Sequence, residues 1–124
     1  NEMRMAAALC RIAEGSPQAV SAAEIFHAAT VSGAQALQRP DLGRLAAGCQ
    51  ADIVLVDVIK PHAVPLRDGI QHLVLSACAA DVDTVFVAGR LVVHRRELTY
   101  GNLADAVARL AEAGDRVNAR VRLE

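Results

Sequence analysis

The chain has 124 residues, with 13 basic and 14 acidic side chains and a formal net charge of −1. This length allows one ordinary domain, and the even charge provides no basic patch for a phosphate backbone, so we expect no nucleic-acid partner. No apolar run reaches the roughly 18 residues that a membrane-spanning helix needs, and we expect no membrane partner.

The cysteines indicate a reducing environment. Cys10, Cys49 and Cys78 stand at unrelated spacings, and no C-x-x-C pair is present. This pattern argues against a disulfide framework or a zinc knuckle, so we expect free thiols in a cytoplasmic protein. The apolar pattern begins directly after Asn1, which is typical of a truncated chain. We therefore expect a C-terminal piece of a longer protein.

Two helices are predicted in the first third of the chain. Residues 2–14 are strong helix formers and are apolar around most of the circumference, so this helix needs neighbours on more than one side. Ser21 and Glu24 form the pattern of a capping box, which begins the second helix. Gly33 is expected to mark a bend or a close backbone approach, and Pro40 follows the end of the helix.

The character of the sequence changes near residue 41. Residues 42–47 are expected to form a short strand. Residues 53–56 are four consecutive β-formers, a pattern typical of a strand covered on both faces. Two prolines frame residues 60–65, which are expected to be irregular, and a helical pattern begins at Asp68.

The last part of the chain predicts a hairpin and a closing helix. Residues 84–88 and 91–94 are short β runs that meet near Gly89, where a positive φ is easily adopted. Asn102 is expected to cap a helix whose apolar stripe is more often core packing than a coiled-coil seam. Two or three strands are few for a stable sheet, so the strand at 53–56 requires further neighbours.

The histidines are the first residues to consider as metal ligands. None of the four stands in an H-x-H pair, an H-E-x-x-H motif or a His/Cys cluster. His27 is expected to be an ordinary helix residue, and His94 a solvated residue at a strand end. His62 and His72 lie ten positions apart. A novel metal site formed by these two residues remains open as a third hypothesis.

Two carboxylates could in principle act as an acid and a base. Asp81 and Asp83 would share one face of an extended segment, but no neighbouring His or Lys completes a site, so solvated acids at a strand entry are expected. The sequence has no G-x-S-x-G, Walker or G-x-G-x-x-G motif. We therefore predict no catalytic, no cofactor-binding and no metal-binding residue in this chain.

Three stretches carry a resemblance to a known family. Residues 29–37 (A-T-V-S-G-A-Q-A-L) resemble the A-T-x-x-G-A-x-A-L element of metal-dependent amidohydrolases. Residues 42–57 resemble that superfamily's L-G-x-L-x-x-G-x-x-A-D-h-V-h-h-D element, in which h is apolar. Residues 65–89 resemble the next segment of its cytosine-deaminase-like and chlorohydrolase-like branch. The resemblance covers residues 2 to about 112.

The resemblance implies an α+β fold for this chain. Residues 1–38 would be the last helices associated with a (β/α)8 barrel, and residues 39–98 the C-terminal share of a small composite β-sandwich. Residues 99–124 would form a C-terminal helix that packs across the sandwich. The family's metal ligands would all lie N-terminal to Asn1, so the chain itself would hold no cofactor.

The resemblance also implies a reaction for the parent protein. The parent would bind zinc or iron and hydrolyse a C–N bond with a metal-activated water, with deamination of a nitrogen heterocycle as the expected case. The leading hypothesis is a C-terminal fragment that is inert alone, whose partners are the missing N-terminal barrel and strands of its own chain. The alternative is a free-standing interaction or scaffold module derived from such an enzyme. Uncovered apolar faces and an unpaired strand edge also predict self-association.

Overall fold

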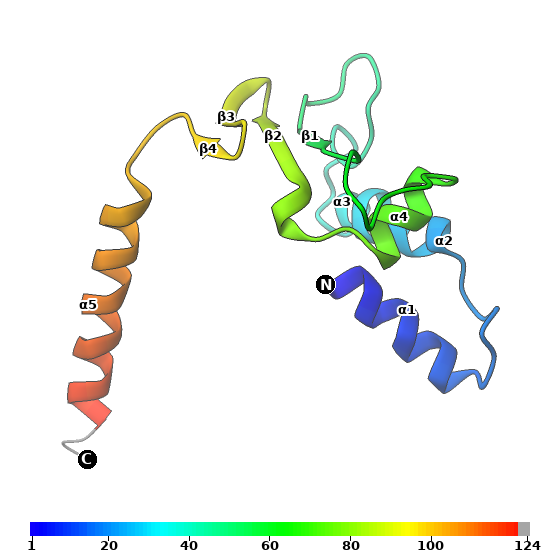
Figure 1. The fold of residues 1–124 in the computed structure, drawn as a ribbon, viewed down its shortest axis with the longest axis horizontal. Coiled ribbons are helices and arrows are strands. Elements are labelled where there is room, and N and C mark those ends of the chain that lie inside the picture. The colour runs from blue at the N-terminus through cyan, green and yellow to red at the C-terminus, as the bar shows by residue number, and fades with distance from the viewer. Residues whose placement is uncertain (122–124) are drawn as a thin grey trace.

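The computed structural model describes residues 1–121, which form a group of helices, a small sheet and an outlying helix (Figure 1). The helices are α1 (Glu2–Ala13), α2 (Ala22–His27), a π-helical turn (Ala28–Ser32), α3 (Gly33–Ala36), α4 (Gly69–Leu75), a 3-10 turn (Ala79–Asp81) and α5 (Leu103–Val121). The strands are β1 (Ile53–Val56), β2 (Val82–Val87), β3 (Arg90–His94) and β4 (Glu97–Leu98). They form one antiparallel sheet in the order β1-β2-β3-β4.

A small aliphatic core joins α1, α2 and α4. Ala7, Ile25 and Val74, one from each helix, are buried against each other, and Met3 and Phe26 are among the residues that pack around them. The predicted helix at 2–14 is confirmed. Large side chains on the rest of α1 remain exposed, so this helix has an uncovered side in this chain.

The capping box at the start of α2 is also confirmed. The Ser21 hydroxyl accepts a hydrogen bond from the Glu24 amide at 3.2 Å, and the Glu24 carboxylate accepts one from the Ser21 amide at 2.8 Å. Asp68 caps α4 in a similar way, because its carboxylate accepts a hydrogen bond from the Gln71 amide at 2.9 Å. Both helices therefore begin where a side chain satisfies a free N–H group.

The prediction of a strand at residues 42–47 is wrong. These residues form turns and bends that cross close to the helical segment before them. Gly43 has a φ of +78°, and a Cβ atom at this position would lie 2.6 Å from the carbonyl oxygen of Thr30. The positive φ and the close approach to the helix interrupt the extended backbone here. Gly33 itself is helical and makes no close backbone approach, because a Cβ atom there would lie 3.8 Å from the nearest carbonyl oxygen, that of Ala28. A π-helical turn at Ala28–Ser32 precedes it.

The hairpin is confirmed, and the sheet includes a short strand, β4, that the sequence did not predict. Ala88 and Gly89 both have positive φ, as a tight two-residue hairpin turn requires, and β4 adds a short third partner beyond β3. β1 lies at the sheet edge and pairs only with β2 among the described residues. Val54 and Leu55 are 54% and 50% exposed. The prediction that β1 is covered on both faces is therefore wrong for the described part of the chain.

The closing helix extends away from the other helices and the sheet (Figure 1). Asn102 caps α5 as predicted, accepting a hydrogen bond from the Ala104 amide at 2.9 Å. α5 then extends away from the sheet (Figure 1), and its apolar residues Leu103, Val107 and Leu110 are exposed. The expected packing of residues 99–124 across the sheet is therefore not present in the described part of the chain (Figure 1). Residues 122–124 lie outside the described residues.

Helices in the described part of the chain do not combine the length and the apolar character needed to cross a membrane.

Candidate functional site

A buried carboxylate is the centre of the candidate site. Asp81 lies where the proline-framed loop 60–65, α4 and the 3-10 turn before β2 meet, and its side chain is 1% exposed. Its Oδ1 accepts a hydrogen bond from the Lys60 ammonium group at 2.9 Å. Its Oδ2 accepts one from the Cys78 amide at 2.8 Å and one from Nε2 of His62 at 2.9 Å.

Local chain geometry explains why Asp81 lies there. Its carboxylate caps the 3-10 turn through the Cys78 amide, while its backbone carbonyl accepts a hydrogen bond from the Asp57 amide at 2.8 Å. Lys60 also donates to the carbonyl oxygen of Ala80 at 2.8 Å. The ammonium group therefore ties the irregular loop to the turn at two points.

These contacts keep Asp81 ionised. The hydrogen bond from the Cys78 amide, followed by those from His62 and Lys60, holds the pKa of Asp81 well below its ordinary value of 3.8. Burial alone would raise this pKa, so the hydrogen-bond donors outweigh desolvation. The site consequently presents a fixed negative charge at neutral pH.

A second histidine lies beside the first. His72, on α4, is 7% exposed, and its ring stacks on that of His62 with a centroid distance of 6.0 Å and an interplanar angle of 24°. Its Nε2 is buried and has no hydrogen-bond partner among the described residues. One potential ligand atom from each of His62, His72 and Asp81 lies within 4.8 Å of the other two.

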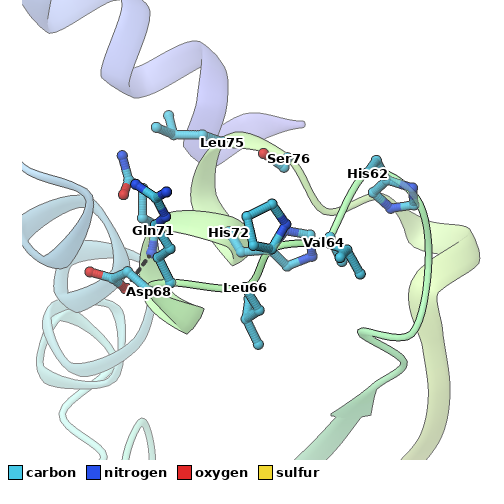
Figure 2. A pocket seen from close by; sticks show the side chains of 11 residues that line it. His62, Val64, Leu66, Asp68, Gln71, His72, Leu75 and Ser76 are labelled. Atoms are coloured by element: carbon cyan, nitrogen blue, oxygen red, sulfur yellow. Dashed lines mark hydrogen bonds between the residues drawn. The ribbon is translucent and has the colours of Figure 1, made fainter.

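An open pocket adjoins the two histidines. It has a volume of about 240 Å³, and Figure 2 shows His62 and His72 in its wall with Val64, Leu66 and Gln71. The hydrogen bond from the Gln71 amide to Asp68, drawn in the figure, fixes the start of α4 on which His72 stands. The two imidazoles therefore border one pocket and are held by separate elements, with His62 exposed and His72 buried.

Two of the four histidines lie apart from the candidate site, and the other two lie within it. His27 is exposed on α2 with its Nδ1 3.2 Å from the Ser32 hydroxyl, and His94 is exposed at the end of β3, both as expected. His62 and His72, the pair left open by the sequence, come together.

The prediction for Asp81 was wrong. It was expected to be a solvated acid without a neighbouring His or Lys, yet it is buried against Lys60 and His62. These partners lie 21 and 19 positions away, so no local pattern could reveal them. Asp83 is separate from this group and accepts a hydrogen bond from the Thr84 hydroxyl.

Comparison with known proteins identifies the family. The sequence model of the amidohydrolase family matches residues 1–92. The chain belongs to the amidohydrolase family. It is 43% identical over 97 residues to the 5-methylthioadenosine/S-adenosylhomocysteine deaminase of Pelotomaculum thermopropionicum, a match that covers 78% of this chain and 22% of the relative.

Two solved structures share the fold of this chain. An adenosine deaminase from Xanthomonas campestris with bound zinc superposes with a TM-score of 0.90 and 34% identity, over 95% of this chain and 27% of its own. The atrazine chlorohydrolase of Arthrobacter aurescens TC1, complexed with zinc, gives 0.81 and 29%, over 90% and 25%. The chain thus spans about a quarter of the length of these relatives.

The candidate site does not fit the catalytic metal that the family implies. The amidohydrolase pattern begins with an H-x-H pair, which this sequence does not contain. His62, His72 and Asp81 stand on a loop, a short helix and a 3-10 turn rather than at the ends of barrel strands. No catalytic step is therefore assigned to residues of this chain.

Proposed function

We propose that this chain is the C-terminal part of a metal-dependent hydrolytic deaminase that removes the amino group of an adenine nucleoside. The observation that carries this proposal is the 43% identity to a 5-methylthioadenosine/S-adenosylhomocysteine deaminase, supported by the TM-score of 0.90 to an adenosine deaminase with bound zinc. Zinc bound in the parent would lower the pKa of a water molecule and so supply the nucleophile.

The contribution of this chain would be structural. β1 offers an unpaired edge, and an apolar groove of about 670 Å³ runs between the segment 26–37 and β1, with Leu42, Ile53 and Leu73 among its lining residues. We assign this groove and edge to the N-terminal part of the parent chain, which would supply the barrel and the remaining strands of the sandwich. This assignment rests on length, because the match covers only 22% of the relative.

Alone, the chain would be inert. The amidohydrolase ligand pattern is not present in its sequence, and the candidate site lacks the arrangement that the family uses. The three cysteines are free thiols, which agrees with a parent that works in the reducing cytoplasm.

A chimera tests this function. The matching segment of the Pelotomaculum deaminase is replaced by this chain, and release of ammonia from 5′-methylthioadenosine is measured with bound zinc. We expect a folded chimera with activity of the same order as the parent enzyme. The isolated chain with zinc or iron should release no ammonia from the same substrate.

Two variants of the chimera test the role of the apolar groove, one with a charge inside the groove and one with a charge outside it. Ile53→Asp should prevent assembly of the sandwich and reduce both the folded yield and the activity, whereas Ile59→Asp, at an exposed position, should change neither. A chimera that folds and binds zinc but releases no ammonia would refute the proposed function. Turnover by the isolated chain would refute its inertness.

The exposed stripe of α5 favours a second candidate. A helix whose apolar residues Leu103, Val107, Leu110 and Val117 face solvent is suited to bind a partner, as a free-standing interaction module would. The chimera separates the two candidates, because a module that evolved away from the enzyme need not support deamination.

A further inference from the structure

One buried imidazole nitrogen has no partner. A neutral histidine has one donor and one acceptor nitrogen, and a nitrogen buried without a partner destabilises the fold. His72 is more than nine-tenths buried, and its Nε2 has no hydrogen-bond partner in the described part of the chain. Such a group calls for an explanation, and an ion is one of the few that fit a site with a neighbouring carboxylate.

The ligand geometry supports this explanation. Nε2 of His62 lies 2.9 Å from Oδ2 of Asp81, and a nitrogen of His72 completes a group of three atoms within 4.8 Å of one another. Bonds of 2.0–2.2 Å place the ligands of a tetrahedral zinc ion about 3.3 Å apart, so the separations would have to shorten by up to about 1.5 Å. His62 can make these adjustments, because its side chain is 43% exposed on a loop.

We propose that His62, His72 and Asp81 form a binding site for a divalent transition-metal ion of the zinc class. Binding would exchange the hydrogen bond between His62 and Asp81 for two metal bonds, one to Nε2 and one to Oδ2. The Nε2 proton of a neutral His62 would move through solvent to Nδ1, so that a neutral imidazole binds the ion. The fourth ligand would be a water molecule from the adjoining pocket, which opens beside both imidazoles.

The charge of Lys60 makes the site prefer zinc-class ions to calcium or magnesium. The Lys60 ammonium group holds Oδ1 of Asp81, so the ion would bind Oδ2 beside the hydrogen bond from the Cys78 amide, as hydrogen-bonded outer groups commonly orient a ligating carboxylate. The same positive charge neutralises much of the carboxylate. Ca²⁺ and Mg²⁺ depend on carboxylate charge and oxygen ligands, whereas zinc-class ions bind neutral imidazole strongly. The site therefore favours zinc or cobalt over calcium or magnesium.

Cobalt(II) provides a spectroscopic test. Zinc is titrated into the chain by calorimetry, and cobalt(II) by visible absorption, which reports tetrahedral nitrogen and oxygen coordination. We expect one equivalent of either ion and no saturable binding of magnesium. His62→Asn and His72→Asn should lower the affinity by more than the roughly 10–100-fold that loss of an outer-shell partner causes.

His94→Asn is the matched control. It removes an exposed histidine at the end of β3 and should leave both titrations unchanged. His62→Asn is the decisive variant, since its exposed side chain can be replaced without opening the core, and circular dichroism verifies its fold. In the zinc-loaded chimera, the same substitution should remove one equivalent of zinc by mass spectrometry. Wild-type affinity in His62→Asn, or equal loss in His94→Asn, would overturn the proposal.

Discussion

The ammonium group of Lys60 lies 2.9 Å from Oδ1 of Asp81, although 21 positions separate the two residues. This ion pair closes the proline-framed loop onto the turn that begins β2. As a result His62, two residues after Lys60, comes to lie against His72 on α4. The position of the candidate metal site is thus set by a single buried carboxylate and the cation that it holds.

The ionised state of Asp81 predicts a dependence of stability on pH. Its pKa is lowered in the folded chain, so the unfolded state binds the proton more tightly, and this contribution to stability is present above the ordinary value of 3.8 and lost as the pH falls further. Urea midpoints should be similar at neutral and mildly acidic pH and fall below about pH 4.

Asp81→Asn should be less stable at neutral pH and lose less of its stability on acidification. Asp57, whose pKa is lowered by the Ile59 amide and by Arg96, would account for part of the remaining decrease. Asp105→Asn, at an exposed position of α5, is the control and should follow the wild type. Parallel pH profiles for Asp81→Asn and the wild type would contradict this assignment.

The aliphatic core predicts a graded response to truncation. Ile25 packs against Ala7 and Val74, and Ile25→Ala should lower the free energy of unfolding by about 2–5 kcal/mol. Ile59→Ala removes the same atoms at a position that is 89% exposed and should change it by less than about 0.5 kcal/mol. Urea denaturation measures both, and equal losses would show that the core has been misplaced.

The turn at Gly43 predicts a steric effect beyond backbone strain. Gly43 and Gly48 both have positive φ, but only at Gly43 would a Cβ atom meet the Thr30 carbonyl. Gly48→Ala should destabilise the chain by about 1 kcal/mol through strain alone. Gly43→Ala should lose roughly 1–3 kcal/mol more, because the helix or the turn must move. Equal unfolding free energies for the two variants would show that the close approach has no energetic consequence.

Local signals allowed most of the fold to be predicted. The capping groups Ser21 and Asp68 and the positive φ at Gly89 act within a few residues, and the elements they begin or connect are where the sequence placed them. Residues 42–47 were misassigned because the decisive contact, between Gly43 and Thr30, lies between separate segments. The four β-formers of β1 predicted a strand covered on both faces, but Val54 and Leu55 are about half exposed in the described part of the chain.

The candidate site could be predicted only in part. His62 and His72 could be considered as a pair, because they lie ten positions apart and an irregular, proline-framed loop can bring them together. Asp81 could not be added from sequence alone, because its burial depends on Lys60 reaching it across the loop. A single sequence contains no signal for such a long-range ion pair.

The exposed stripe of α5 predicts self-association of the isolated chain. Leu110 is 73% exposed, and its neighbours Leu103 and Val107 face the same side, so pairing with a second copy would bury apolar area that is otherwise hydrated. Light scattering should report dimers or larger species at high concentration. The double variant Leu103→Lys/Leu110→Lys should shift the distribution towards monomer, whereas Ala108→Lys, on the opposite side of the helix, should not. A wild-type chain that remains monomeric throughout the concentration series would contradict this prediction, because its apolar stripe would then tolerate solvent without a partner.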